Sequence, residues 1–119
     1  MRRVFLLLIV FSIAAYAQAA HSVSFTITQG TGNTGDPPTS YNVKRATVTG
    51  GPYATVASVA ITGTSQSFTD TAVVAGQTYF YVATEVNSGG ETGVSNQITC
   101  TIPFQAPTSP PSLSAPTVK

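Results

Sequence analysis

Residues 76–86, GQTYFYVATEV, are the stretch that decides the fold. A glycine opens the stretch, and most of the residues from Thr78 onward are aromatic or β-branched, the types that suit a pleated, half-buried surface. We therefore predict a central strand from Thr78 to about Val86. The rest of the chain is expected to pack around it.

Shorter strands are predicted on both sides of this central strand. In residues 21–28, for example, Val, Phe and Ile alternate with Ser and Thr, which is the period of a strand with one buried face. Further strands are expected at residues 41–48, 53–57, 67–70 and 94–102, with an apolar fragment at 59–61. Turn signals separate these short segments, and no segment beyond Ala20 has helical spacing, so the pattern predicts an all-β antiparallel sandwich of six to seven strands.

Residues 1–19 have the order of a secretory signal peptide. A basic pair precedes an apolar run at residues 4–11, and small residues follow, with cleavage expected after Ala17 or Ala19. The alternative is a retained membrane anchor, but the apolar run is shorter than the ~20 residues that a spanning helix needs. We therefore expect a secreted or cell-surface protein with no stable membrane span after cleavage.

Composition limits the partners. Removing the signal leaves roughly 100 residues, which suits a single domain, predicted at residues 20–103. Charged residues make up 8% of the chain, and the part after the signal has three cationic side chains and four carboxylates. No basic surface stripe is available to neutralise phosphates, so nucleic acid is not an expected partner.

No group of residues indicates catalysis, a cofactor or a metal. His21 is the one histidine and stands near the start of the predicted domain, where chain ends are loose. The carboxylates are scattered, and no second His or Cys exists to build a zinc site. Cys100 is the one cysteine, expected as a small core residue, with an intermolecular disulfide as the alternative. The protein is therefore expected not to be an enzyme and to hold no cofactor.

Five short motifs resemble those of bacterial fibronectin type III domains, in the same order and at similar spacing. They are YNV at 41–43, GGPY at 50–53, FTDT at 68–71, AGQTYFYV at 75–82 and SNQI at 95–98. The resemblance covers about residues 21–103 and implies an immunoglobulin-like β-sandwich. It also implies that Tyr79 is the tyrosine-corner residue, whose hydroxyl bonds backbone a few residues upstream.

Two core positions depart from the family pattern. Ile27 stands where the family usually has Trp, so Tyr81 and Phe25 are expected to fill the missing volume. Glu85 stands where the family usually has a small apolar residue, and a buried unpaired carboxylate is costly. Glu85 is therefore expected at the solvated end of the sheet, the alternative being an ion pair with the basic residues of the strand at 41–48.

The family's first strand is missing, and the end of the chain resembles it. Residues 104–119 are Pro-rich, and we expect them to be extended without a core of their own. Within them, residues 110–118 are similar to the family's first strand, with Leu113, Ala115 and Val118 as candidate donor residues. Three interpretations stay open, namely a flexible tail, a strand folded back on its own domain, or a strand donated to a neighbour's open edge.

Two loops are candidate binding segments, because a rigid sandwich presents loops at its ends. They are residues 29–40 and 87–93, which would emerge at the same end of the fold. Their candidate contact residues are Asn33, Asp36, Ser88 and Glu91. Neither loop contains an aromatic or Arg anchor, so simple connectors are the alternative interpretation.

The sequence thus predicts an exported, non-enzymatic interaction module. Its expected partners are a protein or a cell-surface polymer. The alternative is a structural subunit of an extracellular filament or virion surface, assembled with further copies of itself by strand donation from the tail. The two hypotheses differ in where the residues after 103 lie.

Overall fold

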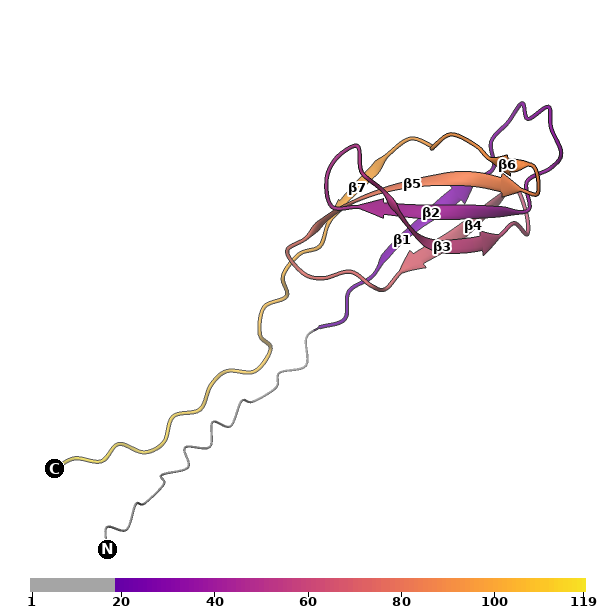
Figure 1. The fold of residues 1–119 in the computed structure, drawn as a ribbon. Helices are drawn as coiled ribbons and strands as arrows, with labels where there is room; N and C mark the ends of the chain where they lie inside the picture. Colours follow the sequence, from indigo (N-terminus) through magenta and orange to yellow (C-terminus); the bar gives the residue numbers. More distant parts are fainter. Residues whose placement is uncertain (1–18) are drawn as a thin grey trace, which may run out of the picture.

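The computed structural model describes residues 19–119 (Figure 1). Within that range all the regular secondary structure is β-strand. The strands are β1 Val23–Thr28, β2 Ser40–Ala46, β3 Ala54–Ala60, β4 Ser65–Asp70, β5 Thr78–Asn87, β6 Gly90–Glu91 and β7 Ile98–Thr101. All but the last residue of the predicted signal peptide lies outside the described residues. The all-β sandwich predicted from the sequence is confirmed.

Two antiparallel sheets of unequal width face each other (Figure 1). The narrow sheet pairs β1 with β4. The wide sheet has the order β3-β2-β5, and β6 and β7 both pair with β5, β6 near its end and β7 near its start. The predicted central strand, β5, therefore has neighbours on both sides, whereas the narrow sheet has two strands to cover the same core.

Two strand predictions were wrong in extent. β3 is one continuous strand of seven residues, not a short strand followed by an apolar fragment, because its whole length pairs with β2. The strand predicted at 94–102 is reduced to β7, four residues long. Before β7, the chain contacts β5 through single bonds, such as Ser95 N–H donating to Ala83 O at 2.8 Å, rather than through a continuous ladder.

The core lies between the sheets, where alternate residues of facing strands meet. Its buried members are Val23, Ile27, Tyr41, Val43, Val73, Tyr79, Tyr81 and Ile102. Phe25 packs on the Tyr81 ring with 5.1 Å between ring centroids, so these two aromatic residues fill the centre as expected. Cys100 is half-buried and packs against this core as a free thiol.

A polar group links the two sheets through Asp70, at the end of β4. Arg45 of β2 donates to Asp70 Oδ2 at 2.7 Å, and the Tyr81 hydroxyl donates to the same oxygen at 2.9 Å. The other carboxylate oxygen accepts from Ala72 N–H, two residues further along the chain. Burial raises the pKa of Asp70, but these hydrogen bonds and the Arg45 charge outweigh it, and the pKa lies below its usual range.

Tyr79 holds the connection between β4 and β5. Its hydroxyl accepts a hydrogen bond from Val74 N–H at 3.1 Å, five residues upstream. Nearby, Gly76 has φ of 80°, and Phe104 lies so close that a Cβ on Gly76 would clash with its ring. Beyond Phe104 the chain forms no strand and runs away from the sandwich (Figure 1).

Candidate functional site

The loop at residues 29–40 is tied to the end of β5 by Glu85. The Glu85 carboxylate accepts from Gly30 N–H at 2.5 Å and from Asn33 Nδ2 at 2.9 Å. Glu85 is half-buried at the end of the sheet and is not paired with the basic residues of β2, so the ion-pair alternative is wrong. What sequence reasoning missed is that the loop supplies neutral donors, which satisfy the carboxylate oxygens but leave its charge uncompensated.

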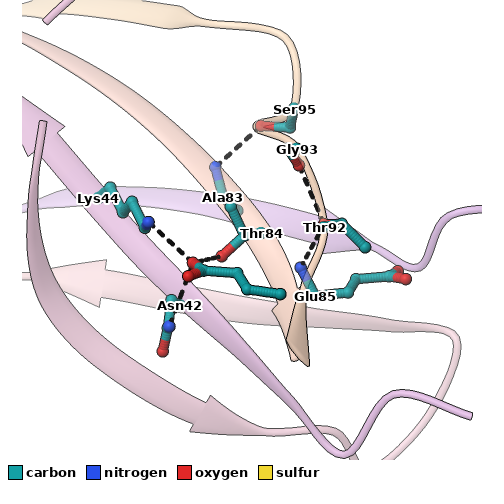
Figure 2. A network of polar contacts seen from close by, with 9 residues as sticks. Asn42, Lys44, Ala83, Thr84, Glu85, Thr92, Gly93 and Ser95 are labelled. Carbon is teal, nitrogen blue, oxygen red and sulfur yellow. Dashed lines mark hydrogen bonds and ion pairs between the residues drawn. The ribbon is translucent and has the colours of Figure 1, made fainter. Parts of the chain in front are cut away.

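Glu91 of β6 is held by three side chains of the wide sheet, Asn42, Lys44 and Thr84, which are labelled in Figure 2. Its carboxylate lies 2.8 Å from Lys44 Nζ and also accepts hydrogen bonds from Thr84 Oγ1 and Asn42 Nδ2. These bonds lower the pKa of Glu91 to about 2. In Figure 2 the Glu85 side chain points away from this cluster. Glu91 is therefore already satisfied by its own sheet and is poorly placed to be a ligand-binding carboxylate.

A polar groove of about 390 Å³ separates the two loops that were proposed to bind. Asn33 and Asp36 line it from one side and Glu91 from the other, whereas Ser88 is not among its lining residues. Asn87 crosses it by donating to the Asp36 carbonyl at 2.9 Å. The two loops do share one end of the sandwich, but the groove offers no aromatic ring and no cationic side chain as an anchor.

A second and more apolar groove follows the open side of β1. One part, about 220 Å³, is lined by residues that include Phe25, Tyr81 and Ile98. The adjoining part, about 240 Å³, leads to Glu85 and includes Val94. The two parts share Ile27, Thr28, Ala83 and Ser95, so they form one continuous channel, here called the β1 groove.

The backbone of β1 offers hydrogen-bonding groups along this groove. Gln29 N–H donates to Thr64 O at 2.8 Å, and this pair continues the register of β1 with β4 by one residue. Because N–H and C=O groups alternate in direction along a strand, the odd-numbered residues of β1 bond to β4 and the even-numbered ones face the other way. Ser24, Thr26 and Thr28 therefore present their N–H and C=O groups to the open edge, where no strand of the described chain pairs with them.

Within the described residues, β3, β4 and β7 also have a free edge each, and that of β3 is less suited to a partner. β3 has one unpaired edge, but its pairing with β2 carries a register shift between Val43 and Lys44. Such irregularities twist an edge and discourage further pairing. The edge of β1 is regular and borders a groove lined by core residues. Apolar Val94 and Ile98 stand exposed beside it, by 56% and 37%.

Two further candidate chemistries find no support in the geometry. Within residues 19–119, no three His, Cys, Asp or Glu side chains lie close enough together to hold a metal ion. None of these residues belongs to a helix long and apolar enough to cross a membrane. His21 lies two residues before β1 and is not among the lining residues of either groove.

Comparison with known proteins gives structural matches alone. No family model matches the chain, and no curated protein does. The fold is similar to a twitchin kinase region from C. elegans, with a TM-score of 0.61 and 18% identity over 73% of this chain; the chain spans 15% of that fragment's length. It is also similar to the crystal structure of an Fn3-like protein from Clostridium thermocellum, with 37% identity, a TM-score of 0.50 and coverage of 70% of this chain and 80% of that one.

Proposed function

The chain belongs to the fibronectin type III-like (Fn3-like) family, and on that premise we propose that it is an exported, non-enzymatic interaction module that takes up an extended segment of a partner polypeptide along β1. The observation that carries the proposal is the coincidence of a regular unpaired strand edge with the apolar β1 groove. Main-chain bonds to such an edge supply affinity, and pockets for alternate side chains supply specificity.

The width of the narrow sheet explains why this edge attracts a partner. The narrow sheet covers its side of the core with two strands, whereas the wide sheet has five. Phe25 and Ile98 therefore keep apolar surface in contact with water. An added strand would bury that surface and satisfy the three outward-facing residues of β1 at once. A polypeptide is favoured over a surface polymer such as a polysaccharide, because sugar has no ladder of amide groups to match the edge.

The non-enzymatic and exported parts of the proposal rest on separate observations. The titratable side chains with resolved contacts are engaged in structural bonds, as with Asp70, Glu91 and, at the end of the groove, Glu85. Export is supported by the signal-like order of residues 1–19. Neither observation depends on which polypeptide binds.

Proline substitution on the open edge tests the proposal. In Thr26→Pro the proline removes an outward-facing N–H and its ring obstructs the edge, whereas the bonds from neighbouring residues to β4 remain. Thr26→Ala is the matched control, because it keeps the N–H and changes a side chain on the outer face. Short random peptides displayed on phage are selected on the wild-type protein. The selected peptides should bind Thr26→Ala as they bind the wild type. Their affinity for Thr26→Pro should fall at least about tenfold, which corresponds to about 1.4 kcal/mol of binding free energy.

A second blocking variant guards against simple unfolding. Ser24→Pro removes the same kind of outward-facing N–H nearer to the start of β1, where proline is tolerated better. Both proline variants should keep the circular dichroism spectrum of the wild type. Peptide binding that survives in folded Thr26→Pro and Ser24→Pro would overturn strand addition at β1.

A further inference from the structure

The segment after the sandwich has the properties of a strand without a sheet. Residues 105–119 are exposed and form no strand of their own, and apolar Leu113 and Val118 are 94% and 90% exposed. The segment leaves the sandwich at the end where β1 begins (Figure 1). An extended segment with exposed apolar side chains and an open edge with an apolar groove are therefore parts of the same molecule.

We propose that residues 113–119 of a second copy of this chain lie along β1, parallel to it, so that two copies exchange their tails and close into a dimer. This inference rests on the proposed function, because it uses the same edge and names its occupant. It requires that the tail fit the edge by side-chain pattern, charge and reach.

The side-chain pattern selects one face of the tail. In a strand, residues of one parity share both the direction of their side chains and the direction of their N–H and C=O groups. If Leu113, Ala115 and Thr117 face the groove and bond to β1, the even positions point outward. Pro116 then lies where no N–H is needed, as proline at a sheet edge requires. Val118, a candidate donor residue by sequence, falls on the outer face instead.

Charge selects the direction. Residues 19–119 contain three cationic side chains, and two of them, Lys44 and Arg45, form ion pairs with carboxylates of their own domain. Lys119 is the third, and it is the one that can pair with a carboxylate of another copy. Lys119 has the parity that faces the groove, and Glu85 stands at the end of the groove beside Gly30. With residues 113–119 parallel to residues 23–29, Leu113 lies level with Val23, next to the apolar part of the groove that starts at Phe25. Lys119 then lies level with Gln29, toward the Glu85 carboxylate. The reverse direction puts the lysine at the apolar end.

Direction in turn decides the kind of assembly. The tail leaves its own sandwich at the start of β1, so a parallel insertion must also enter the second copy at the start of β1 (Figure 1). The two copies then meet by the same end, and the exchange is reciprocal, which gives a closed pair. An antiparallel insertion enters at the opposite end and produces an open head-to-tail chain.

Insertion into the tail's own domain is disfavoured by the connecting segment. The ten residues at 103–112 include four prolines, which favour an extended path over a reversal of direction. Fully extended, such a connection spans up to about 33 Å, enough to reach a neighbouring copy. In the structure the segment continues away from its own sandwich (Figure 1).

Light scattering on the purified chain from residue 20 onward tests the proposal. We expect about twice the monomer mass, and a monomer mass for Leu113→Asp, because a carboxylate buried in the apolar groove raises the dissociation constant at least about tenfold. Ser114→Asp is the matched control, since its side chain faces outward, and should remain dimeric. Leu113 is 94% exposed in the single chain, so Leu113→Asp should unfold at the same urea concentration as a chain ending at residue 104.

Disulfide trapping in a Cys100→Ser background tests the direction. In the parallel arrangement Ser114 lies level with Ser24, and adjacent strands are close enough for a disulfide. The double variant Ser24→Cys with Ser114→Cys should form covalent dimers on a non-reducing gel, and Ser24→Cys with Val118→Cys should not. The opposite result would overturn the closed dimer.

The outcomes separate this inference from the proposed function. A monomeric wild type, or a Leu113→Asp variant that stays dimeric, would overturn the tail as occupant. If peptide binding is nevertheless lost in Thr26→Pro, the open edge keeps its role with a different partner. If Thr26→Pro changes neither dimerisation nor peptide binding, both proposals fail.

Discussion

Three buried tyrosines differ in what their hydroxyls bond. The Tyr79 hydroxyl accepts from Val74 N–H, and the Tyr81 hydroxyl donates to Asp70. The Tyr41 hydroxyl is buried and is the one buried side-chain oxygen or nitrogen of the described residues without a hydrogen-bond partner. Burial, and secondarily the negative charge of Glu85, raise the pKa of Tyr41, so its hydroxyl stays neutral. The Tyr41 ring therefore contributes to the core while its hydroxyl opposes folding.

Phenylalanine substitutions measure this difference. We expect Tyr41→Phe to raise the free energy of unfolding by about 1 kcal/mol, because it removes an unpaired buried polar group. Tyr81→Phe should lower it by about 1.5 to 3 kcal/mol, because a hydrogen bond to the Asp70 carboxylate is lost. Urea unfolding followed by circular dichroism would measure both. Equal losses in the two variants would show that Tyr41 has a partner after all.

At the scale of the element, β1 has two different edges. Its odd-numbered residues bond to β4, and the outer faces of the two strands are joined by side-chain bonds such as Ser24 Oγ to Thr69 Oγ1 at 2.8 Å. Its even-numbered residues have no strand beside them within the described chain. β1 is therefore well held on the side of β4 and open on its other side.

Amide hydrogen exchange should reveal this alternation. In a chain ending at residue 104, the amides of Phe25 and Ile27 should exchange slowly and those of Thr26 and Thr28 quickly, because exchange follows the loss of hydrogen bonding. In the full-length tail-bearing chain, the proposed insertion should slow Thr26 and Thr28 as well. Equal protection at odd and even positions in the shortened chain would contradict an open edge.

At the scale of the whole molecule, exchange of tails couples stability to concentration. A partner that binds the folded state and not the unfolded one raises the melting temperature by mass action. We expect the melting temperature of the wild type to rise with protein concentration, and that of Leu113→Asp to stay constant. Scanning calorimetry over a range of concentrations would measure this, and a constant wild-type value would contradict assembly.

Several strands of this fold could be predicted from the local sequence pattern. Alternation in residues 23–28 and the aromatic stretch at 78–86 placed β1 and β5, because a strand with one buried face must alternate. The shorter β7 and the continuous β3 did not follow, because pairing with a neighbour decides where a strand ends. The sequence also predicted that Asn33, Asp36 and Glu91 lie at one end of the sandwich. It did not predict the bonds in which Glu91 is engaged.

By itself, the sequence determined the all-β class and the strand that forms the centre. Local periodicity and turn residues encode these features. Only the tertiary structure decided that Lys44 pairs with Glu91, that Arg45 pairs with Asp70, and that the Glu85 carboxylate accepts a hydrogen bond from Gly30 N–H. It also decided that β1 borders an apolar groove. These contacts join residues that are distant in sequence, and which distant groups meet depends on sheet order and register rather than on any local pattern.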